Sequence, residues 1–324
     1  MNYRSLEILN RHTIDWASRL PKDIDLIVGI PRSGMLVATL LSLYLNLPLT
    51  SLDSFVNSRL ISAGHRCKIT NQSAFLKTRK NVLVVDDSLY TGAQMQLAKE
   101  TISEANLNHN IRYAAVYVAP GNQSFVDLFY ELLPMPRVFE WNLMHHGDMV
   151  KWCVDIDGVL CRDPTEEEND DGEKYEHFLR TVEPLIIPSV AVGWLVTCRL
   201  EKYRKITEDW LKRNEIKYNN LIMMDVPTKA ARIASGSHSS FKAEIYKKTP
   251  ATLFIESASH QASQIAKLSG KYVFCIETRE MIRPSFISSS IHAQEQFFHL
   301  FLRNPKKAIR KCLRFAKRIY SKIY

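Results

Sequence analysis

The chain has 324 residues, of which 46% are hydrophobic and 24% are charged, a composition typical of a globular protein with room for two domains. Its net charge of +9 equals the nine Lys and Arg residues after position 302, where no acid occurs, so the rest of the chain is formally neutral. No apolar run is long enough to span a membrane and the first ten residues do not resemble a secretory signal, so we expect a cytoplasmic protein.

The first half of the chain alternates predicted strands with predicted helices. Apolar runs predict strands at residues 25–30, 82–85 and 111–118, and helices are predicted at residues 35–45 and 93–105. This order predicts an α/β domain, residues 1–147, with a doubly wound and mostly parallel sheet. Ligands bind such sheets at the carboxyl ends of the strands, where both polar loops of this half are located.

The second predicted strand leads into two adjacent acids, Asp86 and Asp87. A short polar segment follows before the next helix, made of Ser88, Leu89, Tyr90, Thr91 and Gly92. Backbone N–H groups, hydroxyls and a helix N-terminus are suited to a phosphate, and Gly92 allows close approach. The two carboxylates can accept hydrogen bonds from a vicinal diol. Together these groups indicate a ribose 5-phosphate.

This segment resembles the phosphoribosyl pyrophosphate (PRPP) motif of the type I phosphoribosyltransferases. The resemblance implies that Asp86 and Asp87 hold the ribose hydroxyls and that residues 88–92 hold the 5-phosphate. A second loop, residues 29–34, lies about 55 residues before the acids. By the same resemblance it binds pyrophosphate through its backbone and through Arg32, Ser33 and Gly34.

A polar, basic segment at residues 54–80 separates the two loops. Its cations are Arg59, Arg66, Lys68, Lys77 and Arg79. The family closes a mobile loop of this kind over the reacting centre, which would exclude water and stabilise departing pyrophosphate. For any one of these side chains, a solvated surface position is the alternative.

A second alternation of strands and helices begins near residue 148. Strands are predicted at residues 152–156, 192–197, 221–224, 252–256 and 272–276, and helices at residues 201–213 and 260–268. This pattern predicts a second α/β domain at residues 148–290. The six cysteines of the chain are scattered without a CxxC pair, which is typical of reduced thiols.

Two acids, Asp155 and Asp157, follow the first strand of this half at positions i and i+2, so both can face one metal ion and one phosphate. The segment resembles the first motif of the haloacid-dehalogenase (HAD) superfamily of phosphatases. The resemblance implies that Asp155 is the nucleophile, that Asp157 is the general acid and then the base, and that Mg²⁺ is the cofactor.

The remaining motifs of that superfamily can be matched in chain order. Thr197 fits the phosphate-binding hydroxyl and Lys242 fits the neutralising lysine, with Lys247 and Lys248 as rivals. Glu256 fits the third metal ligand beside Asp155 and Asp157. The chain departs from the pattern after Glu256, where a second acid is usual and Ser257 stands instead. The spacing of about 40 residues between the first two motifs leaves room for only a small cap.

The basic C-terminal segment, residues 291–324, has apolar residues at spacings of three and four with Lys and Arg on the opposite face. This pattern predicts an amphipathic helix that binds an anionic membrane surface. Nucleic-acid binding and an unstructured basic end are the alternatives; we expect no nucleic acid.

The two resemblances together predict a bifunctional enzyme. A phosphoribosyl group would move from PRPP to an acceptor, and the second domain would remove the 5-phosphate. The tail and the small cap favour a membrane acceptor such as a lipid-linked glycan or polyprenyl phosphate, in surface-polysaccharide synthesis. Nucleobase salvage and a non-catalytic sensor of PRPP are the alternatives, although the intact acidic pairs argue against a sensor. An oligomer is possible.

Overall fold

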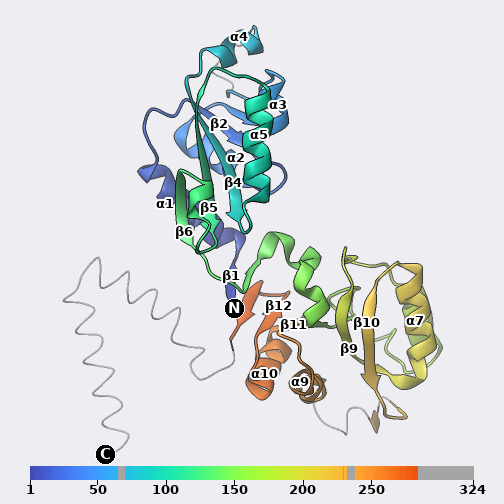
Figure 1. The fold of residues 1–324 in the computed structure, drawn as a ribbon. Coiled ribbons are helices and arrows are strands. Elements are labelled where there is room, and N and C mark those ends of the chain that lie inside the picture. Colours follow the sequence, from blue (N-terminus) through green and yellow to red (C-terminus); the bar gives the residue numbers. More distant parts are fainter. Residues whose placement is uncertain (65–69, 229, 232–237, 284–324) are drawn as a thin grey trace, which may run out of the picture. The chain divides into compact units, whose positions relative to one another are not determined.

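The computed structural model describes residues 1–64, 70–228, 230–231 and 238–283 (Figure 1). The chain divides into two compact units, Met1–Leu143 and Met144–Tyr324. The predicted basic tail, residues 291–324, lies outside the described residues, as do Arg66 and Lys68. In the described part of the chain, no helix combines the length and the apolar character needed to cross a membrane.

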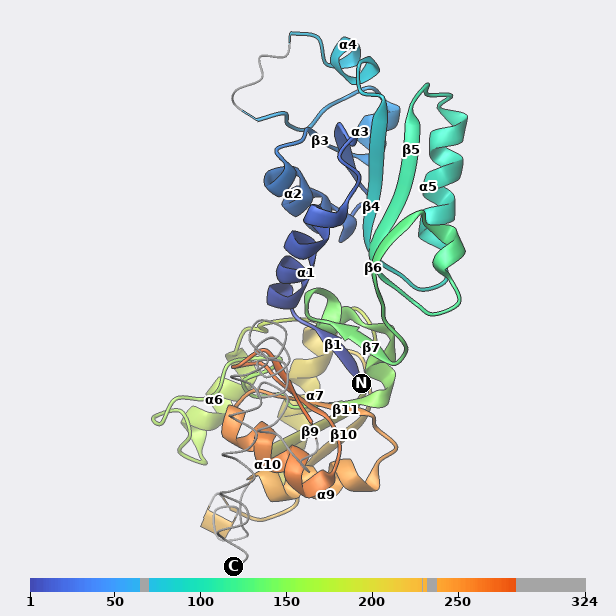
Figure 2. The same ribbon diagram turned by 90° about the vertical axis from the view of Figure 1, so that its left-hand side faces the viewer.

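The first unit is built on a five-stranded sheet whose strands are all parallel and follow the order β3-β2-β4-β5-β6. The strands are β2 (Leu26–Gly29), β3 (Leu49–Ser51), β4 (Asn81–Leu89), β5 (Asn110–Val118) and β6 (Leu128–Leu132). Figure 2 shows β4 and β5 side by side in this sheet. The central strands are apolar on both faces, which requires helices on both sides.

Helices cover both faces of this sheet. The helices are α1 (Leu6–Arg19), α2 (Gly34–Leu45), α3 (Leu52–Val56), α4 (Gln72–Lys77) and α5 (Ala93–Glu104), and a short helix η1 (Gln123–Phe125) follows β5. One hydrophobic cluster joins α1 and α2 to the sheet through Trp16, Val37 and Ile27. A second cluster joins α3 and α5 to the opposite face through Phe55 and Met95.

Two short strands form a separate pair in the first unit. β1 (Asn2–Arg4) runs parallel to β7 (Arg137–Phe139) and places the start of the unit beside its end. The Asn2 amide donates to the Pro136 carbonyl at 2.8 Å. The sequence did not predict this pair, because a three-residue strand carries no periodic signal of its own.

The second unit contains a six-stranded sheet of order β10-β9-β8-β11-β12-β13. Its strands are β8 (Trp152–Val154), β9 (Val192–Leu200), β10 (Tyr218–Met224), β11 (Leu253–Glu256), β12 (Val273–Cys275) and β13 (Glu280–Ile282). All neighbours are parallel except β13, which pairs antiparallel with β12. The predicted α/β class with mostly parallel sheets is therefore confirmed, and β13 is an edge strand that the sequence did not predict.

The described residues of this unit include the longer helices α6 (Glu173–Thr181), α7 (Arg204–Arg213), α9 (His238–Lys248) and α10 (Ser259–Ser269). Three short helices are η2 (Glu140–His145), η3 (Gly147–Lys151) and η4 (Glu201–Tyr203). α9 and α10 pack on the sheet in one hydrophobic cluster around Tyr246 and Phe254. The indole of Trp210 in α7 donates to the Val182 carbonyl at 2.7 Å, which ties α7 to the end of α6. The cysteines within the described residues, Cys153, Cys161, Cys198 and Cys275, are buried thiols.

Candidate active sites

Two loops meet at the carboxyl ends of β2 and β4 in the first unit. The strands are parallel neighbours, so the segments that leave them lie side by side. The Ile30 amide donates to the Val85 carbonyl at 3.0 Å. The Ser33 hydroxyl donates to Oδ1 of Asp87 at 2.7 Å. The structure thus brings the predicted pyrophosphate loop and the predicted ribose-binding acids into direct contact.

Asp87 is held by the protein on both of its carboxylate oxygens. While Oδ1 accepts from Ser33, Oδ2 accepts from the indole Nε1 of Trp141 at 2.8 Å. Trp141 follows β7 and stacks on Phe139 with ring centroids 4.7 Å apart. The sequence did not predict this role for Trp141, because the residue lies 54 positions from Asp87 and belongs to no local motif. Asp87 therefore acts as a tether between three segments of the unit.

Asp86 is the more available of the two acids. Its Oδ1 accepts from the Asp87 amide at 2.8 Å, and the residue is 9% exposed. Burial, followed by the neighbouring Asp87 carboxylate, raises the pKa of Asp86 to about 8. With its pKa raised in this way, the Asp86 carboxyl group can lose its proton and then accept a hydrogen bond from a ligand hydroxyl.

β4 extends further than the sequence predicted. Its pairing with β5 continues through Asp86, Ser88 and Leu89, so these residues belong to the strand and not to a loop. Leu89 is 3% exposed and packs in the hydrophobic cluster that joins α3 and α5 to the sheet. The turn therefore consists of residues 90–92. Gly92 has a φ of 83° and caps α5, and a Cβ on it would lie 2.7 Å from the ring of Phe125.

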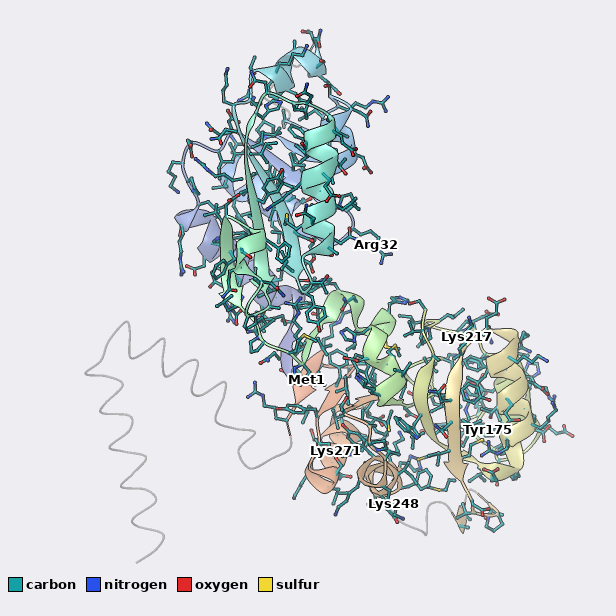
Figure 3. The ribbon with its side chains drawn as sticks, viewed as in Figure 1. Met1, Arg32, Tyr175, Lys217, Lys248 and Lys271 are labelled. Atoms are coloured by element: carbon teal, nitrogen blue, oxygen red, sulfur yellow. The ribbon has the colours of Figure 1, made fainter. Side chains whose placement is uncertain are left out.

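The remaining predicted ligands of this site lie on the surface or beyond the described residues. Thr91 is exposed, and its hydroxyl accepts from the Ala93 amide at 3.4 Å. Arg32 is exposed, and its side chain projects away from the ribbon (Figure 3). Arg59 is exposed as well, after α3. Of the predicted cations among the described residues, Arg32, Arg59 and Lys77 are exposed and Arg79 is half-buried.

Gly34→Ala is expected to destabilise the first unit by about 1–3 kcal/mol, because the added methyl group has no space. A Cβ at position 34 would lie 2.8 Å from the Val85 carbonyl oxygen and 2.9 Å from Oδ1 of Asp86. Gly147→Ala is the matched control, since nothing lies within 4 Å of its Cβ position. Thermal unfolding of the three proteins checks this prediction, and equal melting temperatures would contradict it.

In the second unit, Asp155 follows β8 and lies against Lys242 of α9. Nζ of Lys242 is 2.6 Å from Oδ2 of Asp155 and 2.8 Å from Oε2 of Glu256, which ends β11. All three residues are at most 3% exposed. The rival lysines, Lys247 and Lys248, are exposed at the end of α9. The structure therefore places Lys242, and not its rivals, beside the predicted nucleophile.

The charges of this cluster depend on one another. Burial raises the pKa of Asp155 to about 8, opposed by Lys242 and reinforced by the carboxylates of Glu256 and Asp157. Burial alone would lower the pKa of Lys242, but Asp155 and Glu256 outweigh it and raise that pKa. The ammonium group therefore stays charged and lies between the carboxyl groups of Asp155 and Glu256, whose negative charge it would offset.

Asp157 is bound by a buried arginine that the sequence analysis missed. Nη2 of Arg199 is 2.6 Å from Oδ1 of Asp157, and Nε is 3.1 Å from Oδ2. The side chain of Arg199 is fully buried, and its Cζ lies 5.7 Å from the ring centroid of Trp210. A signal existed in the sequence: Arg199 stands two positions after Thr197, so both share one face of β9. Thr197 is itself buried, and its hydroxyl accepts from the Arg199 amide at 3.2 Å.

A fourth acid, Asp163, lies at the same place. Gly158 has a φ of 75°, and a Cβ on it would lie 2.5 Å from Ser257 and 2.9 Å from Oδ2 of Asp163. Burial and then the carboxylate of Asp157 raise the pKa of Asp163. Asp163 is in a loop without a motif, so no sequence pattern indicated it. Asp163 therefore supplies an acid near Glu256. The superfamily usually has a second acid directly after this position in the sequence, where this chain has Ser257.

The donor set of this cluster suits a hard cation, because it is made of carboxylate oxygens. No group of three or more His, Cys, Asp or Glu side chains in the described ranges is arranged to hold a metal ion. Mg²⁺ does not require such a group, since it usually binds one or two protein carboxylates and completes its shell with water and substrate phosphate. The oxygen donors present are therefore of the kind that Mg²⁺ prefers.

Comparison with known proteins identifies the first unit. Residues 2–142 match the family model described as phosphoribosyl transferase domain, in agreement with the prediction for this part of the chain. A search of curated proteins finds no significant match. The chain is similar to a solved xanthine-guanine-hypoxanthine phosphoribosyltransferase of Helicobacter pylori, with 18% identity over 43% of this chain and 92% of that chain and a TM-score of 0.33.

Two further solved structures resemble the same part of the chain. A purine phosphoribosyltransferase of Pyrococcus horikoshii has 20% identity over 43% of this chain and 92% of that chain, with a TM-score of 0.31. An adenine phosphoribosyl transferase of Trypanosoma brucei has 18% identity over 40% of this chain and 64% of that chain, with a TM-score of 0.26.

Proposed function

We propose that this protein transfers a 5-phosphoribosyl group from PRPP to an acceptor and then removes the 5-phosphate, leaving a plain ribofuranosyl group. The phosphoribosyl transferase domain at residues 2–142 supports the first step. The observation that carries the second step is the buried lysine bridge: Lys242 binds both Asp155 and Glu256 at the carboxyl ends of neighbouring strands. Phosphoryl transfer through a carboxylate needs such an arrangement, because the lysine offsets charge on nucleophile and phosphate alike.

In the transfer step, a nucleophilic atom of the acceptor attacks C1 of PRPP, and the bond from C1 to pyrophosphate breaks. Asp86 is suited to accept a hydrogen bond from a ribose hydroxyl. Asp87, with both oxygens engaged, keeps the strand end and the loop at residues 29–34 in register. The backbone of residues 88–92 and the start of α5 would bind the 5-phosphate, and Arg32 would bind the departing pyrophosphate.

In the phosphatase step, Asp155 attacks the phosphorus atom and the ester bond to the ribose O5 breaks. Water then hydrolyses the aspartyl phosphate and releases inorganic phosphate. Asp157 would protonate O5 and then activate the water. Arg199 donates to both oxygens of Asp157, which fixes the position of this side chain in the cluster. The Thr197 hydroxyl would bind phosphate.

Mg²⁺ is the cofactor we propose for this cluster. Asp155 and Asp157 would hold it, with Glu256 as the third acid, and Asp163 is the nearby acid that the sequence pattern lacked. When bound, the ion would offset negative charge on the transferring phosphoryl group.

The acceptor we propose is a lipid-linked glycan or polyprenyl phosphate in bacterial surface-polysaccharide synthesis. Its support is the sequence of the basic segment, residues 291–324, whose pattern suits an anionic membrane surface. The enzyme would then work as a peripheral protein on the cytoplasmic face of the inner membrane.

Coupled product release tests this function in the wild-type protein. The protein is incubated with PRPP and Mg²⁺, together with either membrane glycolipid extract or pooled nucleobases, and pyrophosphate and inorganic phosphate are measured. We expect release with the extract only, with equal amounts of the two products. Release only with a base would instead indicate nucleobase salvage. PRPP binding without any release would indicate a non-catalytic sensor.

A further inference from the structure

Arg137 is a buried cation of the phosphoribosyl transferase domain whose guanidinium group is not fully hydrogen-bonded among the described residues. The residue begins β7 and is 5% exposed. Its Nη1 atom is buried and has no hydrogen-bond partner among the residues that the structure describes. No described acid forms an ion pair with it. Taking a guanidinium group out of water without an anion is costly, and buried charges are normally paired.

The position of this guanidinium group is defined by two aromatic rings. Its Cζ lies 5.8 Å from the ring centroid of Tyr90 and 5.4 Å from that of Phe139. Tyr90 belongs to the turn after β4, and its side chain is 56% exposed. The guanidinium group therefore lies beside the turn that we propose for phosphate binding.

Asp87 is the acid whose charge reaches Arg137, but the two residues form no ion pair. It contributes a favourable electrostatic interaction with Arg137. Its two oxygens already accept hydrogen bonds from Ser33 and Trp141. The two rings make cation–π contacts with the guanidinium group, and such contacts do not satisfy an N–H donor in the way an oxygen does.

We propose that Arg137 is an oxyanion-binding residue of the phosphoribosyl site, which pairs with a phosphate or carboxylate oxygen of a bound ligand. A planar guanidinium group with free donors is suited to such groups. The oxyanion has two possible sources, the 5-phosphate of PRPP and an anionic group of the acceptor. The inference rests on the proposed transfer reaction and adds a residue that no sequence motif contains.

Arg137→Met tests the inference, because it keeps an apolar stem against the two rings and removes the charge. Binding of PRPP, ribose 5-phosphate and inorganic phosphate is measured by calorimetry, together with the melting temperature. We expect affinity for the oxyanion to fall about 10- to 100-fold, while the melting temperature stays equal or rises. Arg137→Lys should recover part of the affinity. Arg112→Met is the matched control, since Arg112 pairs with Asp23 near the start of β5.

The pattern of losses identifies the source of the oxyanion. Weaker binding of PRPP and ribose 5-phosphate would assign Arg137 to the 5-phosphate. Unchanged binding of both, with slower pyrophosphate release in the presence of glycolipid extract, would assign it to the acceptor. Unchanged binding and unchanged release would overturn the inference, as would a lower melting temperature without any loss of affinity. A wild-type protein that binds no PRPP would instead refute the proposed function, and inorganic phosphate binding would then decide the role of Arg137.

Discussion

Asp86→Asn is expected to raise the melting temperature of the first unit at pH 8 and to abolish pyrophosphate release. The pKa of Asp86 is raised to about 8 by burial and by Asp87. In the unfolded chain the same carboxyl group ionises near pH 4. Between these two values the folded state binds a proton that the unfolded state has lost, so stability decreases as the pH rises from about 4 to 8.

Asparagine removes this pH dependence because it is neutral throughout, and it keeps the oxygen that accepts from the Asp87 amide. We expect the gain at pH 8 to exceed the gain at pH 5 by about 4 kcal/mol, because stability changes by about 1.4 kcal/mol per pH unit between the two pKa values. This difference corresponds to roughly 10 °C in melting temperature. Transfer should fall by about 100-fold or more, because the amide is a poorer acceptor for a ribose hydroxyl.

Calorimetric melting at both pH values, together with a pyrophosphate assay, checks this pair of effects. Asp23→Asn is the control: Asp23 is a surface acid whose pKa is lowered by its hydrogen bond to Arg112, so its replacement should give no gain at pH 8. Equal stability changes for Asp86→Asn at pH 5 and pH 8 would show that Asp86 does not carry a raised pKa.

The strands that lead to both sites were predictable from the sequence, because each is a continuous apolar run that ends in polar residues. The end of β4 was not. The two acids suggested that the strand stops before Asp86, but pairing with β5 continues to Leu89, whose side chain completes a hydrophobic cluster. The sequence pattern of one strand cannot show how far its partner strand extends. In this sheet, the pairing with β5 sets the end of β4.

The partners of the predicted site residues were harder to predict than the residues themselves. Trp141 reaches Asp87 from the segment that follows β7, a strand that pairs with β1 at the other end of the unit's sequence. Asp163 enters the second site through a loop that folds back to Gly158. Arg199 differs from these residues, because the sequence did contain a signal for it. It stands two positions after Thr197 and therefore lies on the same face of β9. Long-range contacts of this kind depend on tertiary structure, which the periodicity of a single segment does not contain.

Asp155→Asn is expected to separate the two proposed reactions. The variant should release pyrophosphate at the wild-type rate with glycolipid extract, because Asp155 belongs to the second unit and the transfer residues belong to the first. Release of inorganic phosphate should fall by roughly 1,000-fold or more, since an amide cannot form the phosphorylated intermediate. The product should therefore keep its 5-phosphate and become detectable by mass spectrometry.

The folded state should survive this change, so that lost activity reports chemistry. Asparagine has the same shape as aspartate, and Lys242 would still pair with Glu256 at 2.8 Å. Asp209→Asn is the matched control, because Asp209 is an exposed acid of the same unit that pairs only with Lys205 among the described residues. If Asp155→Asn released phosphate as fast as the wild type, Asp155 would not be the nucleophile. If Asp155→Asn stopped pyrophosphate release as well, the transfer step would depend on a residue of the second unit. The two reactions would then not be independent.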